Sequence, residues 1–308
     1  MIVPWLRGFR FFSDAPLTWT LIGLNVFYFF LTNGIQPPLV NLGQQDLKLA
    51  GRSYAMMKQQ KTPADPSSLL LLGGQALRDH RFFDSYRDFP PTQDQVALVA
   101  WQNKVSEFET SLRKRPVDTF GLHGQEKHPL SWITYQFMHS GVWHLLGNMV
   151  MLMIFGIALE AISGSALVTL VYLMGGFAGA WLFTIVSPQS SAPMVGASAS
   201  LSALMAFYAL FERRRRVRFF YFISPAPGYW GEIYLPTLLV LPLYFVEDLA
   251  QFFATSEEIG TGIAYSAHLG GAIFGITLAL VLRWVCVRFP RWEQILYASY
   301  SRSQPEAP

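Results

Sequence analysis

Three groups of polar side chains interrupt apolar stretches of this sequence, and polar groups are costly enough there to mark candidate functional sites. The first group begins at His139 and contains His144 and Asn148. Because His144 and Asn148 are four residues apart, a helix would place them on one face, one turn from each other. Both side chains can donate hydrogen bonds, and two donors aimed at one point suit a developing oxyanion.

The second group, Gly196-Ala197-Ser198-Ala199-Ser200, opens a segment rich in small residues. A serine at the start of a helix can present its hydroxyl, and the free backbone N–H groups there can stabilise negative charge. The small neighbours of Ser198 leave room for a peptide backbone to approach. Taken alone, however, a serine in such a segment is more often a contact between packed helices than a nucleophile.

The third group contains His268, followed by Gly271 and Gly275. Glycines at that spacing allow one transmembrane helix to come close to another. His268 precedes this contact face by one turn, so its side chain is expected to face the neighbouring helix. Such a histidine can be a structural hydrogen-bonding group, part of a proton path or a catalytic base. Spacing alone does not show that residues 144, 198 and 268 meet.

The composition of the chain indicates what positions these groups. The 308 residues are 52% hydrophobic and 14% charged, whereas a soluble domain carries nearer a quarter charged residues. The apolar residues come in blocks of about 20, the length that crosses the roughly 30 Å hydrocarbon layer of a bilayer. The sequence therefore predicts an all-α membrane protein with six transmembrane helices, at about residues 17–33, 131–157, 165–186, 195–211, 233–253 and 264–284.

Basic residues set the expected orientation, because loops rich in Lys and Arg stay in the cytoplasm. Arginines precede the first predicted span and follow the fourth and the sixth, which puts both termini on the cytoplasmic side. No small-residue cleavage pattern follows the first apolar block, so we expect a retained span and not a signal peptide. The predicted division is a tail and first helix (1–35), an extracytoplasmic loop insertion (36–129), a five-helix remainder (130–286) and a cytoplasmic tail (287–308).

The long loop insertion is expected to be partly helical. Thr92 and Gln95 form a capping-box pattern just before an apolar stripe that runs from Ala97 through Trp101 to Leu112. That spacing predicts an amphipathic helix ending near Arg115. Such a helix could rest on the bundle or the membrane surface, or belong to a subdomain that grips a substrate.

Several classes of ligand are not expected. The net charge of +3 comes from basic residues at the ends of apolar blocks and in one polar loop, without the interleaved aromatics that bind nucleic acid strands. The single cysteine, Cys286, excludes an internal disulfide and a thiolate cluster. His139 and His144 have no accompanying carboxylate or thiolate ligands of the kind that zinc requires. We therefore expect no cofactor, no metal and no nucleic acid.

Taken together, the polar groups resemble the motifs of the rhomboid family of intramembrane serine proteases, over roughly residues 130–285 and the first span. The family carries two histidines five residues apart and an asparagine four further on, a Gly-x-Ser motif opening the fourth span, and Ala-His followed by a glycine pair in the sixth. A glutamate before a Gly-Ser pair is also typical. The matching residues here are His139, His144, Asn148, Gly196, Ser198, Ala267, His268, Gly271, Gly275, Glu160, Gly164 and Ser165.

The resemblance implies a Ser–His dyad that cleaves transmembrane segments of membrane proteins without a third carboxylate. Ser198 would be the nucleophile and His268 the base. The oxyanion hole would contain His144, Asn148 and the Ser198 backbone N–H. The glycine pair would bring the sixth helix near the fourth. We expect His139 and Glu160 to be structural, and the fifth span to be a moving gate.

Some residues depart from the family pattern. Ala199 stands where a glycine is usual, which is expected to crowd the oxyanion site. Ser202 stands where many members carry an aromatic residue that packs on the base, so another ring such as Tyr265 or Phe207 would have to replace it. Glu247 and Asp248 could approach His268, although no family motif gives them a role.

Two other classes of function compete with the protease. One is a catalytically inactive rhomboid-like protein that binds or routes transmembrane clients, but such relatives typically lack the serine or the base. The other is a transporter that uses the histidines as a proton relay, which predicts acidic partners and an internal repeat.

For the protease, clients would be transmembrane helices weakened by Gly, Pro or polar residues, because an intact helix hides its carbonyls. The short tails and six-span layout favour a bacterial inner membrane.

Overall fold

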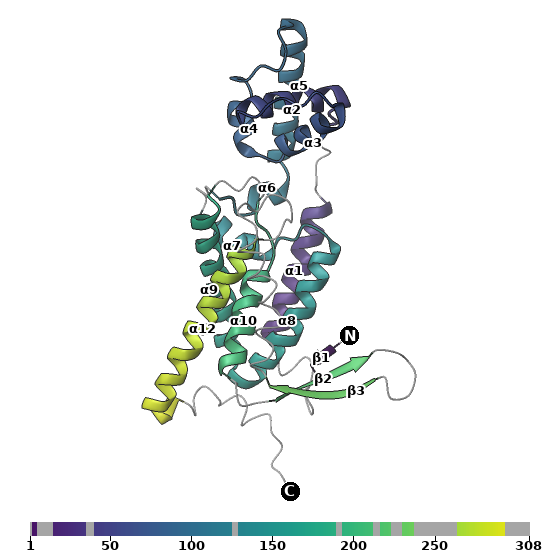
Figure 1. Ribbon diagram of the computed structural model, residues 1–308. Helices are drawn as coiled ribbons and strands as arrows, with labels where there is room; N and C mark the ends of the chain where they lie inside the picture. Colours follow the sequence, from purple (N-terminus) through teal and green to yellow (C-terminus); the bar gives the residue numbers. More distant parts are fainter. Residues whose placement is uncertain are drawn as a thin grey trace.

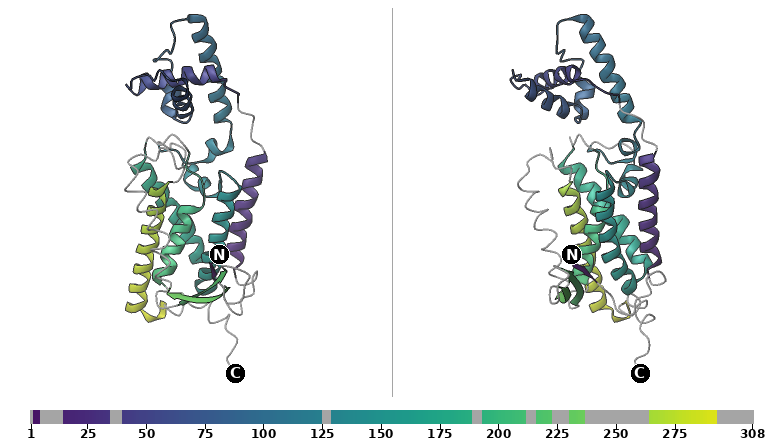
Figure 2. Two further views of the ribbon diagram at one scale, coloured as in Figure 1. Left: turned by 45° about the vertical axis from the view of Figure 1, so that its right-hand side comes forward. Right: turned by 90° about the vertical axis from the view of Figure 1, so that its right-hand side faces the viewer.

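The computed structural model describes residues 2–4, 15–34, 40–124, 129–188, 193–211, 216–222, 230–236 and 264–292. Its long apolar helices stand side by side in one bundle (Figure 1). Two further views show α1 and α12 on opposite sides of this bundle, with α10 between them (Figure 2). The bundle helices are α1 (Pro16–Gly34), α8 (Val142–Ser163), α9 (Ser165–Val186), α10 (Ser198–Phe211) and α12 (Tyr265–Arg288).

Length and composition make the protein an integral membrane protein. Among the described residues, α8, α9 and α12 are both long enough and apolar enough to cross a bilayer, while α1 and α10 are shorter apolar helices. Nearly all the side chains of α10 are buried, and its alanines and serines allow the neighbouring helices to approach closely. The predicted fifth span lies outside the described residues beyond residue 236, as do Glu247 and Asp248.

The second predicted span, 131–157, is not one continuous helix. It begins with two short turns, α7 (Ser131–Thr134) and the 3-10 helix η1 (Tyr135–Phe137), and the long helix α8 starts only at Val142. Between them the backbone is extended at Met138, with a ψ of 146°, and at Gly141, with a φ of −177°. This break separates the polar residues of η1 from those of α8, so the two sets reach the site from different directions.

A three-stranded antiparallel sheet was not expected from the sequence, which predicts helices only. Its strands are β1 (Ile2–Pro4), β2 (Arg216–Phe222) and β3 (Trp230–Pro236), in the order β1-β2-β3. Aromatic and β-branched residues dominate β2, and such residues favour extended backbone. The sheet lies at one end of the bundle (Figure 1), and β3 takes up residues 233–236, which were assigned to the fifth span.

At the other end of the bundle lies a separate cluster of helices, α2 (Gln44–Met57), α3 (Pro66–Ala76), α4 (His80–Ser85) and α5 (Gln95–Arg113), followed by α6 (Pro116–Phe120) (Figure 1). The apolar stripe of α5 does not rest on the bundle. Trp101 and Val105 are instead buried in a small core with residues of α2 and α4. The insertion is therefore a helical module with its own core.

The start of α5 differs from the predicted capping box. Asp94, and not Thr92, caps the helix, because its carboxylate accepts hydrogen bonds from the backbone N–H groups of Val96 and Ala97 at 2.9 and 3.3 Å. The Thr92 hydroxyl instead accepts a hydrogen bond from the backbone N–H of Asp94, which precedes the helix. The helix ends at Arg113, close to the predicted end.

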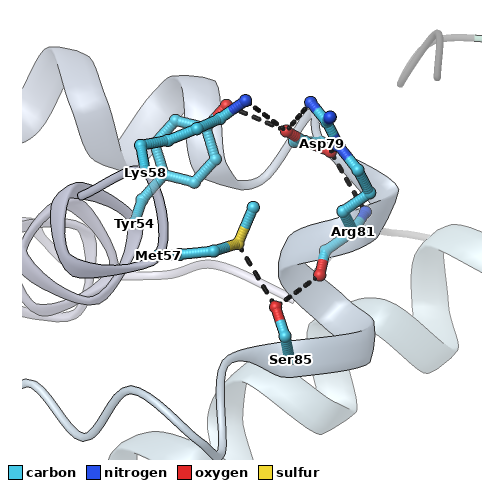
Figure 3. A network of polar contacts seen from close by, with 6 residues as sticks. All are labelled: Tyr54, Met57, Lys58, Asp79, Arg81 and Ser85. Carbon is cyan, nitrogen blue, oxygen red and sulfur yellow. Dashed lines mark hydrogen bonds and ion pairs between the residues drawn. The ribbon is translucent and has the colours of Figure 1, made fainter. Parts of the chain in front are cut away.

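Asp79 joins α2 to α4 inside this module (Figure 3). Its carboxylate, almost fully buried, accepts hydrogen bonds from the Tyr54 hydroxyl at 2.9 Å and from the Arg81 guanidinium at 2.8 Å, and Lys58 lies 3.7 Å away. It also caps α4 through the Arg81 backbone N–H. Burial by itself would raise the pKa of this carboxyl, but the hydrogen bonds from Arg81 and Tyr54 outweigh it and hold the pKa below its ordinary value of 3.8.

We predict that Asp79→Asn lowers the free energy of unfolding of the module by about 1–3 kcal/mol at neutral pH, because a buried hydrogen-bonded charge is lost. Since the folded-state pKa is lowered, the stabilisation is complete above the unfolded value of 3.8 and disappears as the pH falls through the folded-state pKa. Hydrogen exchange of α4 in the full-length protein, measured from pH 6 to pH 3, tests this. The exposed Asp88→Asn is the control, and equal pH profiles for wild type and Asp79→Asn would contradict the prediction.

Candidate active site

Ser198 and His268 meet although 70 positions separate them in the sequence. Ser198 is the first residue of α10, and His268 lies in the first turn of α12. The Nε2 atom of His268 is 2.8 Å from the Oγ atom of Ser198, and both side chains are half-buried. In this geometry a neutral imidazole can accept the serine hydroxyl proton, which is the arrangement of an activated nucleophile.

The glycine pair of α12 determines how closely the two helices approach. A Cβ atom added at Gly271 would collide with the backbone carbonyl of Ala199, and one added at Gly275 would collide with the carbonyl of Ala203. Contact between the two helices therefore continues along α12 for about two turns beyond His268. Close backbone packing of this kind requires glycine, because any side chain would push the helices apart.

Ala199 does not face the predicted oxyanion site. Its methyl group lies against Gly179 of α9, where an added Cβ would be 2.6 Å away, and the residue is buried. The expectation that Ala199 crowds the oxyanion site is therefore wrong. The methyl points into the contact between α10 and α9, and the missing side chain at Gly179 accommodates it.

His144 and Asn148 converge on the residue two positions before Ser198. A Cβ added at Gly196 would lie 2.8 Å from His144 Nε2 and 3.4 Å from Asn148 Nδ2. Gly196 has a φ of +123°, a backbone conformation that favours glycine. The space that a side chain would occupy at Gly196 is thus bordered by two polar nitrogens, beside the serine.

The two side chains differ in how they are held. His144 Nδ1 is 3.0 Å from the Ser140 hydroxyl, which fixes the orientation of the ring. The buried Nδ2 atom of Asn148 has no hydrogen-bond partner among the described residues. A buried donor of this kind is costly unless a ligand uses it. Asn148 is therefore available to donate to an incoming oxygen atom.

The remaining predicted residues lie around this centre. His139 is buried, and its ring and the His144 ring form a T-shaped pair with a centroid distance of 5.2 Å. Tyr265 lies beside His268, with ring centroids 6.4 Å apart and planes nearly perpendicular. Phe207, the other ring considered as a neighbour of the base, stacks on Phe211 instead.

Glu160 lies at the opposite end of α8 and joins three helices. Its buried carboxylate accepts hydrogen bonds from the backbone N–H groups of Leu17 and Thr18 at 2.9 and 2.7 Å, and from the Thr18 hydroxyl at 2.6 Å. The Ser165 hydroxyl at the start of α9 donates to the same carboxylate at 2.6 Å. A carboxylate at the N-termini of two helices stabilises both.

Sequence reasoning missed the part played by η1 beside the serine. The Tyr135 carbonyl accepts from the backbone N–H of Gly196 at 2.9 Å, and the Gln136 side chain accepts from the Ser200 hydroxyl at 2.9 Å. Gln136 is fully buried. A signal was present, because Gln136 and Ser200 are polar residues inside predicted spans, the same criterion that marked the three groups.

The segment before Ser198 is also tied to the helical module. Leu122, just after α6, forms an antiparallel bridge with Met194, in which each backbone N–H donates to the other residue's carbonyl at 2.9 and 2.7 Å. The loop that leads into α10 is thus held by Leu122 on one side and by Tyr135 on another.

Within the described ranges, no group of three or more His, Cys, Asp or Glu side chains could hold a metal ion.

The arrangement contains a serine hydroxyl, an imidazole nitrogen in contact with it and two side-chain nitrogens close to the serine. These are the parts needed for acyl transfer, in which a serine attacks a carbonyl and hydrogen bonds stabilise the oxyanion. Ser198 and His268 are on two helices of a membrane bundle, so a carbonyl that reacted with them would have to reach them from within or beside the bilayer.

Comparison with known proteins gives a consistent result. Residues 126–285 match the Rhomboid domain family. Rhomboid-related protein 2 of Mus musculus is 32% identical over 160 residues, which cover 50% of this chain and 48% of that protein. Rhomboid-related protein 1 of Caenorhabditis elegans is 27% identical over 255 residues, covering 76% and 66%.

The mitochondrial Rhomboid protein 1 of Saccharomyces cerevisiae is 26% identical over 152 residues, covering 48% of this chain and 40% of that protein. The matched region thus spans about half the length of the mouse relative and less of the yeast one. All three alignments are shorter than the full length of the relative, so the likeness concerns the shared region.

Proposed function

The chain belongs to the rhomboid family, and on this premise we propose that it is an intramembrane serine endopeptidase that cleaves transmembrane segments of other membrane proteins. The observation that carries the proposal is the 2.8 Å contact between Ser198 Oγ and His268 Nε2 within the family-matched region. A serine that only packed between helices would not need an imidazole nitrogen at its hydroxyl. The half-buried position of both side chains leaves the pair open to a substrate.

In the proposed reaction, Ser198 Oγ attacks the scissile carbonyl carbon while His268 takes the hydroxyl proton. The new C–O bond gives a tetrahedral oxyanion. When the C–N bond breaks, His268 returns the proton to the leaving amine and the acyl group stays on Ser198. A water molecule, deprotonated by His268, then releases the acyl group as a carboxylate and restores the serine.

The oxyanion would form in the space beside Gly196. The donor available there is Asn148 Nδ2, with His144 Nε2 and the Ser198 backbone N–H at the start of α10 as the other two. Because Asn148 Nδ2 lacks another hydrogen-bond partner among the described residues, no existing hydrogen bond of this donor would have to break when the oxyanion forms. This arrangement supports a preorganised oxyanion hole.

The proposed substrates are membrane proteins whose spanning helices unwind readily. A helix hides its backbone carbonyls in its own hydrogen bonds, so a client must offer a weakened stretch with Gly, Pro or polar residues near the site. The family resemblance suggests a small residue on the acyl side of the cut.

Under the predicted topology, the end of the bundle that carries the sheet faces the cytoplasm and the α2–α5 module lies outside. The sequence favours a bacterial inner membrane, although relatives named as mitochondrial leave an organelle as the alternative.

The test is cleavage of a single-span protein by the purified full-length chain in phospholipid vesicles. The substrate carries a Gly-Ala pair near one end of its span, and a matched substrate carries Leu-Leu instead. We expect the first to be cut faster, and we expect a fluorophosphonate probe to label Ser198, located by mass spectrometry. A folded protein that neither cuts nor labels would contradict the proposal and favour the binding protein without activity.

We predict that Asn148→Ala lowers kcat by about 10²- to 10³-fold, the usual effect of losing one oxyanion donor. KM should change little, because the donor acts mainly on the developing charge. Steady-state kinetics on the Gly-Ala substrate measure both constants. Asn25→Ala, which alters a buried asparagine of α1 far from Ser198 in sequence, is the control for general loss of stability. Equal losses in the two variants would contradict a role for Asn148 in the reaction.

A further inference from the structure

Two consecutive residues, Tyr135 and Gln136, contact the chain on both sides of the nucleophile. The Tyr135 carbonyl accepts from the N–H of Gly196, two residues before Ser198. The Gln136 Oε1 atom accepts from the hydroxyl of Ser200, two residues after Ser198. Both hydrogen bonds are 2.9 Å long. The nucleophile is therefore bracketed by contacts from one short 3-10 turn.

The turn itself is firmly held. The Tyr135 hydroxyl donates to the Gly176 carbonyl of α9 at 2.7 Å, and the Gln136 Nε2 atom donates to the Trp132 carbonyl at 3.2 Å. Gly176 also leaves the space that the Gln136 carboxamide occupies, since a Cβ added there would overlap that group. Tyr135, Gln136 and Ser200 are all buried, so no water competes for these bonds.

The position of Ser200 decides what the bond to Gln136 can do. Successive residues of an α-helix are rotated by 100°, so side chains two positions apart point about 200° apart. Ser198 faces His268 on α12, and Ser200 faces Gln136 on nearly the opposite side of α10. Two contacts on opposite sides of one turn fix the rotation of the helix about its axis, and with it the direction of the Ser198 hydroxyl.

We propose that Gln136 is a positioning residue for the nucleophile: through Ser200 it fixes the rotation of the first turn of α10 and thereby the Ser198–His268 geometry. This rests on the proposed function. The pair is not part of the dyad and touches no reacting atom. Without it, the first turn of α10 keeps its contacts with α12 and α9 but loses one contact that opposes rotation, and a displacement of about 1 Å at a reacting atom can cost 10²-fold in rate.

The experiment compares Ser200→Ala, Gln136→Leu and the double variant with wild type in phospholipid vesicles. The readouts are kcat and KM on the Gly-Ala substrate, the rate of fluorophosphonate labelling, and the midpoint of thermal unfolding. We expect each single variant to lower kcat and the labelling rate by about 10- to 100-fold with KM nearly unchanged. Ser163→Ala, which removes a hydroxyl bonded within α8, should match wild type in all readouts.

The double variant separates positioning from simple stabilisation. It leaves neither partner of the Ser200–Gln136 bond unpaired, so its unfolding midpoint should rise above that of Gln136→Leu, while the bond from Gln136 Nε2 to the Trp132 carbonyl is absent from both variants. If Gln136 positions the nucleophile, kcat and the labelling rate of the double variant stay low even though its unfolding midpoint has risen. If kcat recovers together with the midpoint, the pair only stabilises the bundle and the inference is wrong. If wild type itself neither cleaves nor labels, the proposed function fails first, and the inference fails with it.

Discussion

Ser198→Ala will abolish cleavage and fluorophosphonate labelling, with a loss of about 10⁴-fold or more in kcat. The reason is that the Oγ atom of Ser198 lies 2.8 Å from His268 Nε2, so its removal deletes the nucleophile and leaves the imidazole without the proton it is placed to accept. Steady-state cleavage of the single-span substrate in vesicles measures the effect, in an assay that can detect a rate about 10⁴-fold below that of wild type.

His268→Ala should reduce kcat to a similar level, because an unactivated serine hydroxyl is a weak nucleophile. Losses from two members of one catalytic unit are not additive, so the double variant should be no slower than either single one. Ser163→Ala serves as the control for loss of a serine hydroxyl from the bundle. Cleavage by Ser198→Ala at the wild-type rate would show that another residue is the nucleophile.

Gly271→Val should have the second largest effect, because it separates the two helices that carry the dyad. The first added carbon already overlaps the Ala199 carbonyl, and backbone atoms on α10 cannot move aside as a flexible side chain would. Overpacking of this kind costs about 1–3 kcal/mol of stability. Separately from this loss of stability, a displacement of about 1 Å between Ser198 and His268 would lower kcat by roughly 10²-fold.

Gly23→Val is the matched control for this substitution. Gly23 lies on an exposed face of α1, and a Cβ added there would meet no other atom within 4 Å. The two variants share the intrinsic cost of valine in a helix, so their difference isolates the contact between α12 and α10. Thermal unfolding and cleavage rate are measured for both. Equal unfolding midpoints and rates would show that α12 can move away from α10 without harm.

Much of the bundle could be predicted because a bilayer imposes a simple rule. Apolar segments of sufficient length must form helices there, so α9 was predicted at residues 165–186 with the bounds that the structure gives. The rule says nothing of segments at the ends of the bundle. The pairing of β1 with β2 joins residues more than 200 positions apart, and no local sequence pattern predicts such a pairing.

The break between η1 and α8 was missed for a related reason. Residues 131–157 are apolar enough to be taken as one span, but Met138 and Gly141 adopt extended backbone. That break lets Tyr135 and Gln136 reach Gly196 and Ser200 on both sides of Ser198, while His144 and Asn148 reach Gly196 from α8. Hydropathy measures how apolar a segment is and not where its backbone turns.

By itself, the sequence determined which residues could do chemistry, because polar side chains within apolar spans are few and costly. It also determined the family, through motifs whose order and spacing are local properties of the chain. Only the tertiary structure decided that Ser198 and His268 meet at 2.8 Å, that Ala199 faces α9, and that Gln136 holds Ser200. These distances depend on how α10 lies between α9 and α12, and that packing arises from contacts between residues far apart in the chain, which spacing along the sequence does not encode.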